Sequence, residues 1–327
     1  MRSGMSAIRD TPLPHFEVQL RAPDIARWLA GNTGIPGFTS FTGPVAGPHV
    51  MVLALTHGNE IAGAIALDRL LAAGLRPLWG RLTFGFVNLA AFARFDPDQP
   101  TTSRFVDEDM NRVWDAALLD GSLRSVELAR ARQIRALVES TDVLLDIHSM
   151  LWPSDPLILC GPTARGQALA QAVGMPGLMV ADAGHVNGRR IIDHPRFTDP
   201  ARLPVGILVE AGQHWLAGTV DTVLGCIAGL LRHTGMATDH PALPAPPSPA
   251  PTPRLAEVTT TVTAATAGFA FVEPWRGGTV VARRNTLIAM DGNAEIRTPY
   301  DNCLLVMPSL RTSRGHTAVR LARVRGV

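Results

Sequence analysis

The chain has 327 residues, of which 46% are hydrophobic and 18% are charged, so it is long enough for about two domains and too apolar to be intrinsically disordered. All 30 basic residues are arginine, which excludes mechanisms that need a lysine, such as Schiff-base catalysis or a phosphate-binding loop. The formal net charge is only +2 and the arginines are scattered along the chain, so we expect no nucleic-acid partner.

The first ten residues, Met1 to Asp10, contain no apolar segment of the kind found in secretory signals. The longest apolar runs are far shorter than the ~20 residues that cross a bilayer. Cys160, Cys226 and Cys303 are odd in number and too far apart for a disulfide framework or a thiolate zinc site, so we expect three small buried apolar residues. These features predict a soluble cytoplasmic protein with no membrane partner.

Short apolar runs alternate with amphipathic segments over the first 240 residues. Six runs are typical of buried strands: 50–55, 82–87, 143–147, 157–160, 178–180 and 205–209. Four segments have apolar residues at helical spacing: 61–73, 125–139, 167–173 and 220–231. This alternation predicts an α/β fold in which a largely parallel sheet is covered by helices on both faces.

Residues 241–253 (PALPAPPSPAPTP) contain seven prolines in thirteen positions, which is typical of an extended, semi-rigid linker. The residues that follow are rich in Thr, Val and Gly with turn signals, and they predict a small all-β unit. We therefore expect a larger domain over residues 1–240 that carries the functional site, the linker over 241–253, and a small β domain over 254–327.

Polar residues follow three of the predicted strands directly. The motif HGNE (57–60) follows the first strand, and His148 and Glu210 follow two later ones. Ligands of open α/β sheets bind outside the carboxyl ends of the strands, so we expect these side chains to meet at one edge. An H-x-x-E pair with a later histidine can form the His₂Glu set of a catalytic zinc site. The alternative, in which His57 caps a helix and His148 is a structural core residue, explains each histidine singly but not their convergence with the carboxylates.

A second polar cluster is RFVDEDMNR at residues 104–112. Its charge density alone is typical of a solvated loop. Beside a metal site, however, Asn111 and the planar guanidinium of Arg112 are suited to binding a substrate carboxylate. Asp109 can accept a hydrogen bond from the second ring nitrogen of a metal-bound histidine and so set its tautomer.

Four motifs in order resemble the succinylglutamate desuccinylase and aspartoacylase family, which is related to the zinc carboxypeptidases: HGNE at 57–60, RFVDEDMNR at 104–112, DIHS at 146–149 and VEAG at 209–212. The downstream β unit also agrees with that family. The resemblance implies a zinc-carboxypeptidase-like mixed sheet flanked by helices, with a small C-terminal all-β domain near the mouth of the active site.

The resemblance also assigns roles to the polar residues. It implies one zinc ion per chain with three protein ligands: His57, Glu60 and His148. It implies that Glu210 is the general base that activates water and that Arg104 polarises the scissile carbonyl and stabilises the oxyanion. The other implied roles are the binding of a substrate carboxylate by Asn111 and Arg112 and the support of a zinc-bound histidine by Asp109.

Two features of the family are not matched at a single position here. Aspartoacylase uses an arginine shortly before the general base, for which Arg196 and Arg202 are both suitably placed. It also uses a C-terminal tyrosine, whereas the only tyrosine of this chain, Tyr300, lies too early in the sequence. The sequence therefore predicts no particular acyl group or amino acid.

Together these features predict a zinc-dependent amidohydrolase that removes the acyl group from an N-acylated amino acid or a similar small carboxylate-bearing amide. One alternative is a metallocarboxypeptidase that acts on short peptides. The other is a non-catalytic metal- or solute-binding module, which would need no general base at Glu210. The absence of G-x-S-x-G and G-x-G-x-x-G motifs argues against a serine hydrolase and a dinucleotide site. The oligomeric state stays open, a homo-oligomer included.

Overall fold

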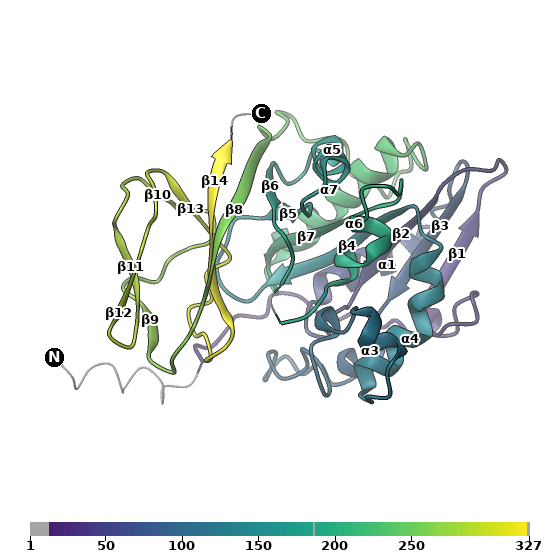
Figure 1. Ribbon diagram of the computed structural model, residues 1–327. Coiled ribbons are helices and arrows are strands. Elements are labelled where there is room, and N and C mark those ends of the chain that lie inside the picture. The colour runs from purple at the N-terminus through teal and green to yellow at the C-terminus, as the bar shows by residue number, and fades with distance from the viewer. Residues whose placement is uncertain (1–12, 186, 326–327) are drawn as a thin grey trace.

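The computed structural model describes residues 13–185 and 187–325. A large mixed sheet flanked by helices lies beside a small antiparallel sheet (Figure 1), which confirms the predicted α/β class with added β structure near the C-terminus. The N-terminal stretch that we expect to lack a secretory signal lies outside the described residues. Within the described part, no helix combines the length and apolar character needed to cross a membrane.

Among the described residues, eleven strands form the large sheet and three form the small one. The large sheet runs in the order β1 (Phe38–Thr42), β3 (Arg81–Phe86), β2 (His49–Ala54), β4 (Val143–Met150), β7 (Val205–Gln213), β5 (Leu157–Leu159), β6 (Leu178–Ala181), β8 (Arg254–Thr263), β14 (Thr317–Arg325), β13 (Cys303–Val306) and β10 (Val280–Val281). The small sheet runs in the order β12 (Ala294–Arg297), β11 (Leu287–Asp291) and β9 (Phe269–Phe271).

The six predicted strands are confirmed as β2 to β7, and most of their ends lie within one or two residues of the prediction. Strands β3, β2, β4 and β7 are parallel neighbours, as expected for strands that are buried on both faces. On either side of this parallel centre the pairing is antiparallel, since β1 pairs with β3 and β5 pairs with β7 in that direction. The sheet is therefore mixed, and its parallel centre brings the ends of β2, β4 and β7 to one edge.

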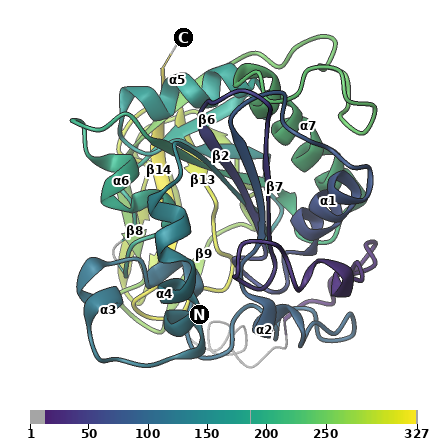
Figure 2. The same ribbon diagram turned by 90° about the vertical axis from the view of Figure 1, so that its right-hand side faces the viewer.

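The helices lie on both faces of this sheet: α1 (Ile61–Ala72), α2 (Leu89–Phe92), α3 (Ala116–Asp120), α4 (Val126–Glu139), α5 (Ala164–Val173), α6 (Pro195–Thr198) and α7 (Ala217–His233). Figure 2 shows α1 and α7 on one side of the central strands and α3, α4 and α6 on the other. Apolar residues of α1, α5 and α7 share one core cluster with the sheet, whereas those of α4 belong to a second. The four predicted helices are confirmed as α1, α4, α5 and α7, and Ser125 caps α4 by accepting a hydrogen bond from the Leu128 N–H.

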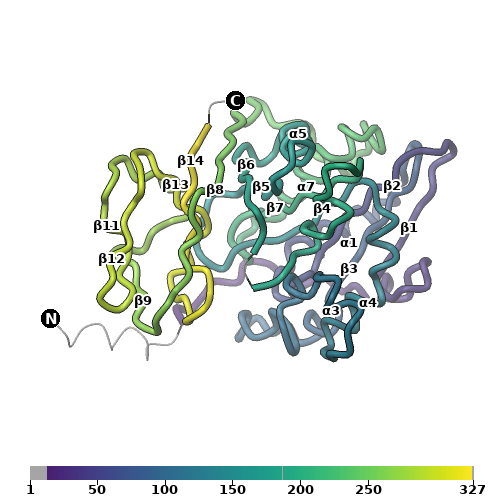
Figure 3. Tube along the Cα trace, viewed as in Figure 1, coloured from purple at the N-terminus to yellow at the C-terminus, as the bar shows by residue number. Residues whose placement is uncertain are grey.

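The residues after the proline-rich stretch continue the large sheet. The expected linker, 241–253, contains no helix and no strand and runs between α7 and β8. Strand β8 pairs in parallel with β6, and β14 then pairs with β8. In Figure 3, β8 and β14 stand between the helix-flanked strands and the small sheet. Residues 254–325, here called the C-terminal β unit, are thus joined to the larger part by hydrogen bonds, and they also have a core cluster of their own.

The three cysteines are free and buried, as predicted. Burial raises the pKa values of Cys160 and Cys226 to about 12. Each therefore behaves as a small apolar side chain of the core rather than as a nucleophile.

Candidate metal centre and active site

The ends of three neighbouring strands supply the residues of the site. Strand β2 leads into the turn that carries His57 and Glu60, and α1 begins at the next residue, Ile61. His148 lies on β4, and Glu210 lies opposite it on β7 as its partner in the strand register. The parallel centre of the sheet thus places these side chains at one edge, as the sequence predicts.

The turn between His57 and Glu60 depends on a close backbone approach. A Cβ atom on Gly58 would lie 2.4 Å from the backbone of Ala91 and 2.5 Å from that of Ser103. The backbone carbonyl of Asn59 accepts a hydrogen bond from Trp215 Nε1 at 3.1 Å. Only glycine fits at position 58, and the turn is held between two other segments of the chain.

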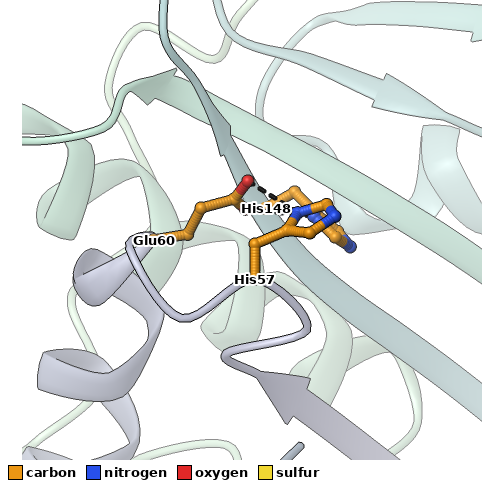
Figure 4. A group of neighbouring side chains, drawn as sticks. All are labelled: His57, Glu60 and His148. Carbon is orange, nitrogen blue, oxygen red and sulfur yellow. Dashed lines mark hydrogen bonds and ion pairs between the residues drawn. The ribbon is translucent and has the colours of Figure 1, made fainter. Parts of the chain in front are cut away.

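His57, Glu60 and His148 are buried and point toward one another (Figure 4). One ligand atom from each lies within 4.8 Å of the others. The Glu60 carboxylate lies between the two imidazoles, with Oε1 2.8 Å from His57 Nδ1 and Oε2 3.0 Å from His148 Nδ1. Two imidazole nitrogens and one carboxylate are the donor set of a catalytic zinc site.

The second nitrogen of each imidazole faces an aspartate. His57 Nε2 lies 2.8 Å from Asp109 Oδ1, and His148 Nε2 lies 2.8 Å from Asp146 Oδ2. A proton on each Nε2 therefore donates to a carboxylate, which leaves the Nδ1 lone pair directed at the common point. Asp109 has the contact expected from the sequence. Asp146 was not predicted, although its position two residues before His148 in a strand places both side chains on one face.

The charges around these groups favour a cation. Burial raises the pKa of Glu60, but His57 and His148 lower it more, so that it falls well below its ordinary value. Burial lowers the pKa of His148, but Asp146 and Glu60 raise it well above its ordinary value. Positive charge is thus stabilised between these carboxylates. Both the donor types and the charge of the site fit a divalent metal ion.

The 104–112 segment is not a solvated loop. Its backbone N–H groups at Val106, Asp107 and Glu108 donate hydrogen bonds to the buried carboxylate of Glu127, at 2.7, 3.0 and 3.3 Å. Burial raises the pKa of Glu127, but the hydrogen bonds from Asn88 and from these backbone groups lower it by more. The pKa therefore lies below its ordinary value. The segment is therefore held as an ordered wall beside the histidines.

Arg104 extends from this wall over the candidate ligands. Its Nη1 lies 3.3 Å from Glu60 Oε1 and its Nη2 lies 3.1 Å from Asp109 Oδ2. The side chain remains about one third exposed (36%), so part of the guanidinium faces the cavity. This placement suits a fixed positive charge beside a reacting carbonyl.

Glu210 faces a cavity of about 160 Å³ beside the histidines. Burial raises the pKa of Glu210 to about 8, and Oε2 has no hydrogen-bond partner among the described residues. A carboxyl group that titrates near neutral pH can both accept and return a proton. The cavity is lined by His57, Glu60, Arg104, Ser149, Met150, Leu151, Trp152, Ser154, Glu210, His214, Met307, Pro308 and Ser309.

Asn111 and Arg112 lie beside the metal centre but not in the lining of this cavity. Asn111 is buried, with Nδ2 3.3 Å from His148 Nε2 and with Oδ1 accepting a hydrogen bond from the backbone N–H of Ile191. Arg112 Nη1 donates to the backbone carbonyl of Asn111 at 2.6 Å. Asn111 therefore contacts a candidate ligand directly, whereas Arg112 lies next to Asn111 and has no carboxylate within ion-pair distance in the described part of the chain.

The other candidates from the sequence lie elsewhere. Arg196 pairs with Asp142, which precedes the start of β4, and Arg202 pairs with Asp199 before β7. Both arginines are thus near the amino ends of the strands, at the edge opposite the site. The Tyr300 hydroxyl contacts Thr259 in the C-terminal β unit, and its ring belongs to the core of that unit.

Several cavity residues were not predicted individually, although the resemblance implies a β domain near the mouth of the active site. Ser149 Oγ lies 2.7 Å from His214 Nδ1, and both residues line the cavity. Met307, Pro308 and Ser309 follow β13 and bring the C-terminal β unit to the same cavity. Ser149 lies on β4, whereas His214 follows β7 and residues 307–309 follow β13. Strand periodicity does not predict that they meet, because tertiary packing brings them together.

Residues 46–193 match the family model of the succinylglutamate desuccinylase/aspartoacylase catalytic domain. Over this part of its length, the chain is similar to that family. The match includes the HGNE turn, the 104–112 segment and His148, whereas Glu210 lies beyond it. The expectation that the four motifs raised is thus confirmed for the first three of them, and the assignment of Glu210 depends on its geometry.

The chain is also similar to individual known proteins. A probable aspartoacylase from Parasynechococcus marenigrum (strain WH8102) is 34% identical over 105 residues, which cover 31% of this chain and 33% of the relative. The match therefore spans about a third of that protein. The crystal structure of a succinylglutamate desuccinylase from Vibrio cholerae has a TM-score of 0.66 at 17% identity and covers 88% of this chain and 86% of its own.

A third relative, a succinylglutamate desuccinylase/aspartoacylase from Rhodobacter sphaeroides, has a TM-score of 0.63 at 19% identity over 94% of each chain. At such low identity the two structures show the fold. Their coverage extends well beyond the catalytic-domain match, so the C-terminal β unit is part of the shared architecture.

Proposed function

We propose that the protein is a zinc-dependent amidohydrolase that removes the acyl group from an N-acylated amino acid or a similar small carboxylate-bearing amide. The observation that carries the proposal is the buried His57–Glu60–His148 group, with His57, Glu60 and Glu210 lining one small cavity and His148 next to Glu210 in the strand register. The names of the matched relatives, a desuccinylase and an aspartoacylase, are those of acyl-removing enzymes.

In this proposal one zinc ion per chain is held by His57, Glu60 and His148. Bound zinc supplies Lewis acidity, which polarises a carbonyl group and makes water more acidic. Glu210 takes the proton from the water that attacks the carbonyl carbon, and it returns this proton to the nitrogen as the C–N bond breaks. The products are the carboxylate of the acyl group and the free amine.

Two arginines have separate tasks in this scheme. Arg104, at the cavity wall, stabilises the negative charge that develops on the carbonyl oxygen, a role worth roughly 3–4 kcal/mol for one oxyanion donor. Arg112, beside Asn111, binds a carboxylate of the substrate. Asp109 keeps His57 in the tautomer that can bind the metal.

The size of the cavity favours small substrates. Its volume is about 160 Å³, and Met307, Pro308 and Ser309 of the C-terminal β unit line it together with Met150 and Trp152. A groove for extended peptides would need an open path at this point, so the geometry favours a deacylase over a metallocarboxypeptidase. The base at Glu210 likewise favours an enzyme over a metal-binding module.

The compartment is part of the proposal too. Three free, buried cysteines suit a reducing environment. We therefore propose that the protein acts in the cytoplasm on a small-molecule substrate.

The experiment that tests the function is an assay of the zinc-loaded protein against a panel of N-acyl amino acids and dipeptides. Hydrolysis of N-acyl amino acids is the expected result, and a fully zinc-loaded protein that hydrolyses neither class would refute the proposal.

Replacing Arg112 by lysine should weaken the binding of substrates with a free α-carboxylate while leaving their amides almost unaffected. Lysine keeps the charge but loses the planar fork that can donate two parallel hydrogen bonds. The expected rise in KM for the acids is about 10-fold or more, as for the loss of one charge-assisted hydrogen bond. The measurement is KM for matched acid and amide substrates, with Arg135→Lys on α4 as the control. Equal effects on acids and amides would exclude a carboxylate contact.

Replacing Met307 by alanine should shift the enzyme toward longer acyl groups. Met307 lines the cavity from the C-terminal β unit, and removing its side chain leaves room for added methylene groups. We expect the ratio of kcat/KM for a longer acyl group to that for acetyl to rise by about 10-fold, the usual value of one methylene in an apolar pocket. Met290→Ala on β11, outside the cavity, is the control. An unchanged ratio would show that this loop does not limit acyl length.

A further inference from the structure

Three arginines from distant parts of the chain lie near one another beside the active site. Arg112 is the last residue of the wall segment, Arg190 precedes the short helix Ile191–Asp193, and Arg320 lies on β14 of the C-terminal β unit. On β14, Ala322 shares a strand face with Arg320 and packs in the same core cluster as residues of β6. The Arg320 side chain therefore extends from the C-terminal β unit toward the catalytic strands, where Asp182 lies 3.7 Å away.

Arg190 is fully neutralised by two carboxylates. Its guanidinium donates to both oxygens of Asp182, at 3.0 and 2.8 Å, and to both oxygens of Asp193, each at 2.8 Å. Burial lowers the pKa of Arg190, but these two carboxylates raise it more, so it ends above its ordinary value. All four oxygens of Asp182 and Asp193 therefore already accept hydrogen bonds from Arg190.

Arg320 has no such partner. It is only 6% exposed, and its Nε has no hydrogen-bond partner among the described residues. Its single ion pair, 3.7 Å from Nε to Asp182 Oδ2, reaches an oxygen that already accepts from Arg190. A buried cation without a hydrogen-bonded anion is costly, because it has lost its hydration without an equivalent replacement.

Arg112 also lacks a hydrogen-bonded carboxylate among the described residues. Its guanidinium donates to a backbone carbonyl, and Asp109, the nearest acidic group on its own segment, already holds His57 and Arg104. Burial, with Arg104, Arg190 and Arg320 acting in the same direction, lowers the pKa of Arg112 to about 10. Burial also lowers the pKa of Arg320. Glu210 forms no hydrogen bond or ion pair with Arg112 or Arg320 within the described residues, where the one ion pair of Arg320 is with Asp182.

The remaining titratable group of this cluster is His185, whose Nε2 lies 3.4 Å from Thr317 on β14. Burial and the charges of Arg112, Arg320 and Arg190 lower its pKa to about 3, so the ring is neutral and adds no anion. Two neighbouring guanidinium groups, the buried one of Arg320 and the half-buried one of Arg112, therefore lack a hydrogen-bonded counter-ion among the described residues. An anion bound between them would supply the missing charge and the missing acceptors.

We propose that Arg320 binds a carboxylate of the substrate together with Arg112, so that the C-terminal β unit contributes a specificity-determining residue to the active site. The inference deepens the proposed function and depends on it for the identity of the anion as substrate. Each guanidinium offers a planar pair of donors, and a carboxylate has enough acceptor positions for both. Tyr300, the expected tyrosine, packs in the core of the unit, whereas Arg320 is close enough to the site for its charge to oppose the rise that burial causes in the pKa of Glu210.

The first test uses Arg320→Gln and a ligand that is not hydrolysed. Succinate should raise the melting temperature of the zinc-loaded wild-type protein, whereas succinamide, its uncharged analogue, should not. In Arg320→Gln the succinate effect should be lost, and the Kd for succinate should rise by about 10- to 100-fold, the usual cost of losing a hydrogen bond to a charged group. The control is Arg325→Gln, an equal change of charge on the same strand at an exposed pair with Glu257.

The melting temperature of Arg320→Gln without ligand is a second measurement. A purely structural role of Arg320 predicts a change in the opposite direction from an anion-binding role. If Arg320 is an uncompensated buried charge, then Arg320→Gln should melt at the same temperature as the wild type or higher. If instead its ion pair with Asp182 supports the fold, the melting temperature should fall and the succinate effect should persist, which would overturn the proposal. Arg320→Met, which keeps the length of the apolar stem, repeats the test. Failure of both variants to fold would also overturn it.

Kinetics separate this inference from the proposed function. Arg320→Gln should raise KM for N-acyl amino acids by about 10-fold or more while leaving KM for their amides unchanged. If the wild-type protein hydrolyses neither class, the proposed function fails, but succinate binding still decides whether Arg320 forms an anion site. If hydrolysis occurs and neither KM nor succinate binding changes in the variant, the inference fails and the function stands.

Discussion

Replacing His148 by alanine should remove both the bound zinc and the hydrolytic activity. The imidazole is 2% exposed and provides one of three candidate ligand atoms within 4.8 Å, so its loss leaves two ligands, one fewer than catalytic zinc sites use. We expect the zinc content to fall from about one per chain to a small fraction. Activity should fall by more than the ~10- to 100-fold that follows the loss of an outer hydrogen-bond partner. Metal analysis and a hydrolysis assay on the same preparation measure both effects.

Two control variants test whether the loss of zinc and activity is specific to a ligand histidine. His233→Ala removes an exposed imidazole at the end of α7 and should leave zinc and activity unchanged. Asp146→Asn removes the carboxylate that faces His148 Nε2 and should weaken zinc binding by about 10- to 100-fold without abolishing it. A His148→Ala protein that retains stoichiometric zinc would refute the ligand assignment.

Replacing Glu210 by glutamine should leave zinc bound but lower kcat by ~10²–10⁴, the usual contribution of general acid–base catalysis. Glutamine has nearly the shape of glutamate but cannot take a proton from water or return it to the leaving amine. Glu210 is not one of the three clustered ligands, so the metal content should be unaffected. The measurements are kcat and the zinc content, with Glu139→Gln, at a half-exposed position on α4, as the control.

The Glu210→Gln experiment also distinguishes two hypotheses, a catalytic protein and a non-catalytic metal-binding module. A Glu210→Gln protein within a few-fold of the wild-type rate would remove this residue from the mechanism. Loss of zinc from the variant would instead make Glu210 a ligand, contrary to the geometry of the site. A large fall in kcat with zinc retained is the result that supports the proposed base.

Much of the fold follows from local patterns in the sequence. A strand that is buried on both faces can have apolar side chains at every position, so β2, β4 and β7 appear in the sequence as apolar runs. The polar residues that follow each run mark the end of the strand. The spacing of His57 and Glu60 within one turn is a local property, and so is the cap that Ser125 places on α4. Ligand types with this spacing at strand ends therefore predict the candidate metal centre before any tertiary contact is known.

The sequence was less informative where residues act across long separations. Arg196 and Arg202 precede Glu210 at suitable distances along the chain, yet they lie at the opposite edge of the sheet. Distance along the chain does not determine which end of a strand a loop occupies. Tyr300 was the only tyrosine to consider, and it packs inside the C-terminal β unit.

The sequence by itself determined the α/β class, the order of the central elements and the residue types of the metal centre, since these depend on periodicity and on spacings of a few residues. Only the tertiary structure decided the contributions from the far end of the chain. Pairing of β8 with β6 brings the C-terminal β unit alongside the catalytic strands, and this places Met307 at the cavity and Arg320 next to Asp182. No local pattern encodes such contacts, because they arise from hydrogen bonds and packing between segments that are more than seventy residues apart.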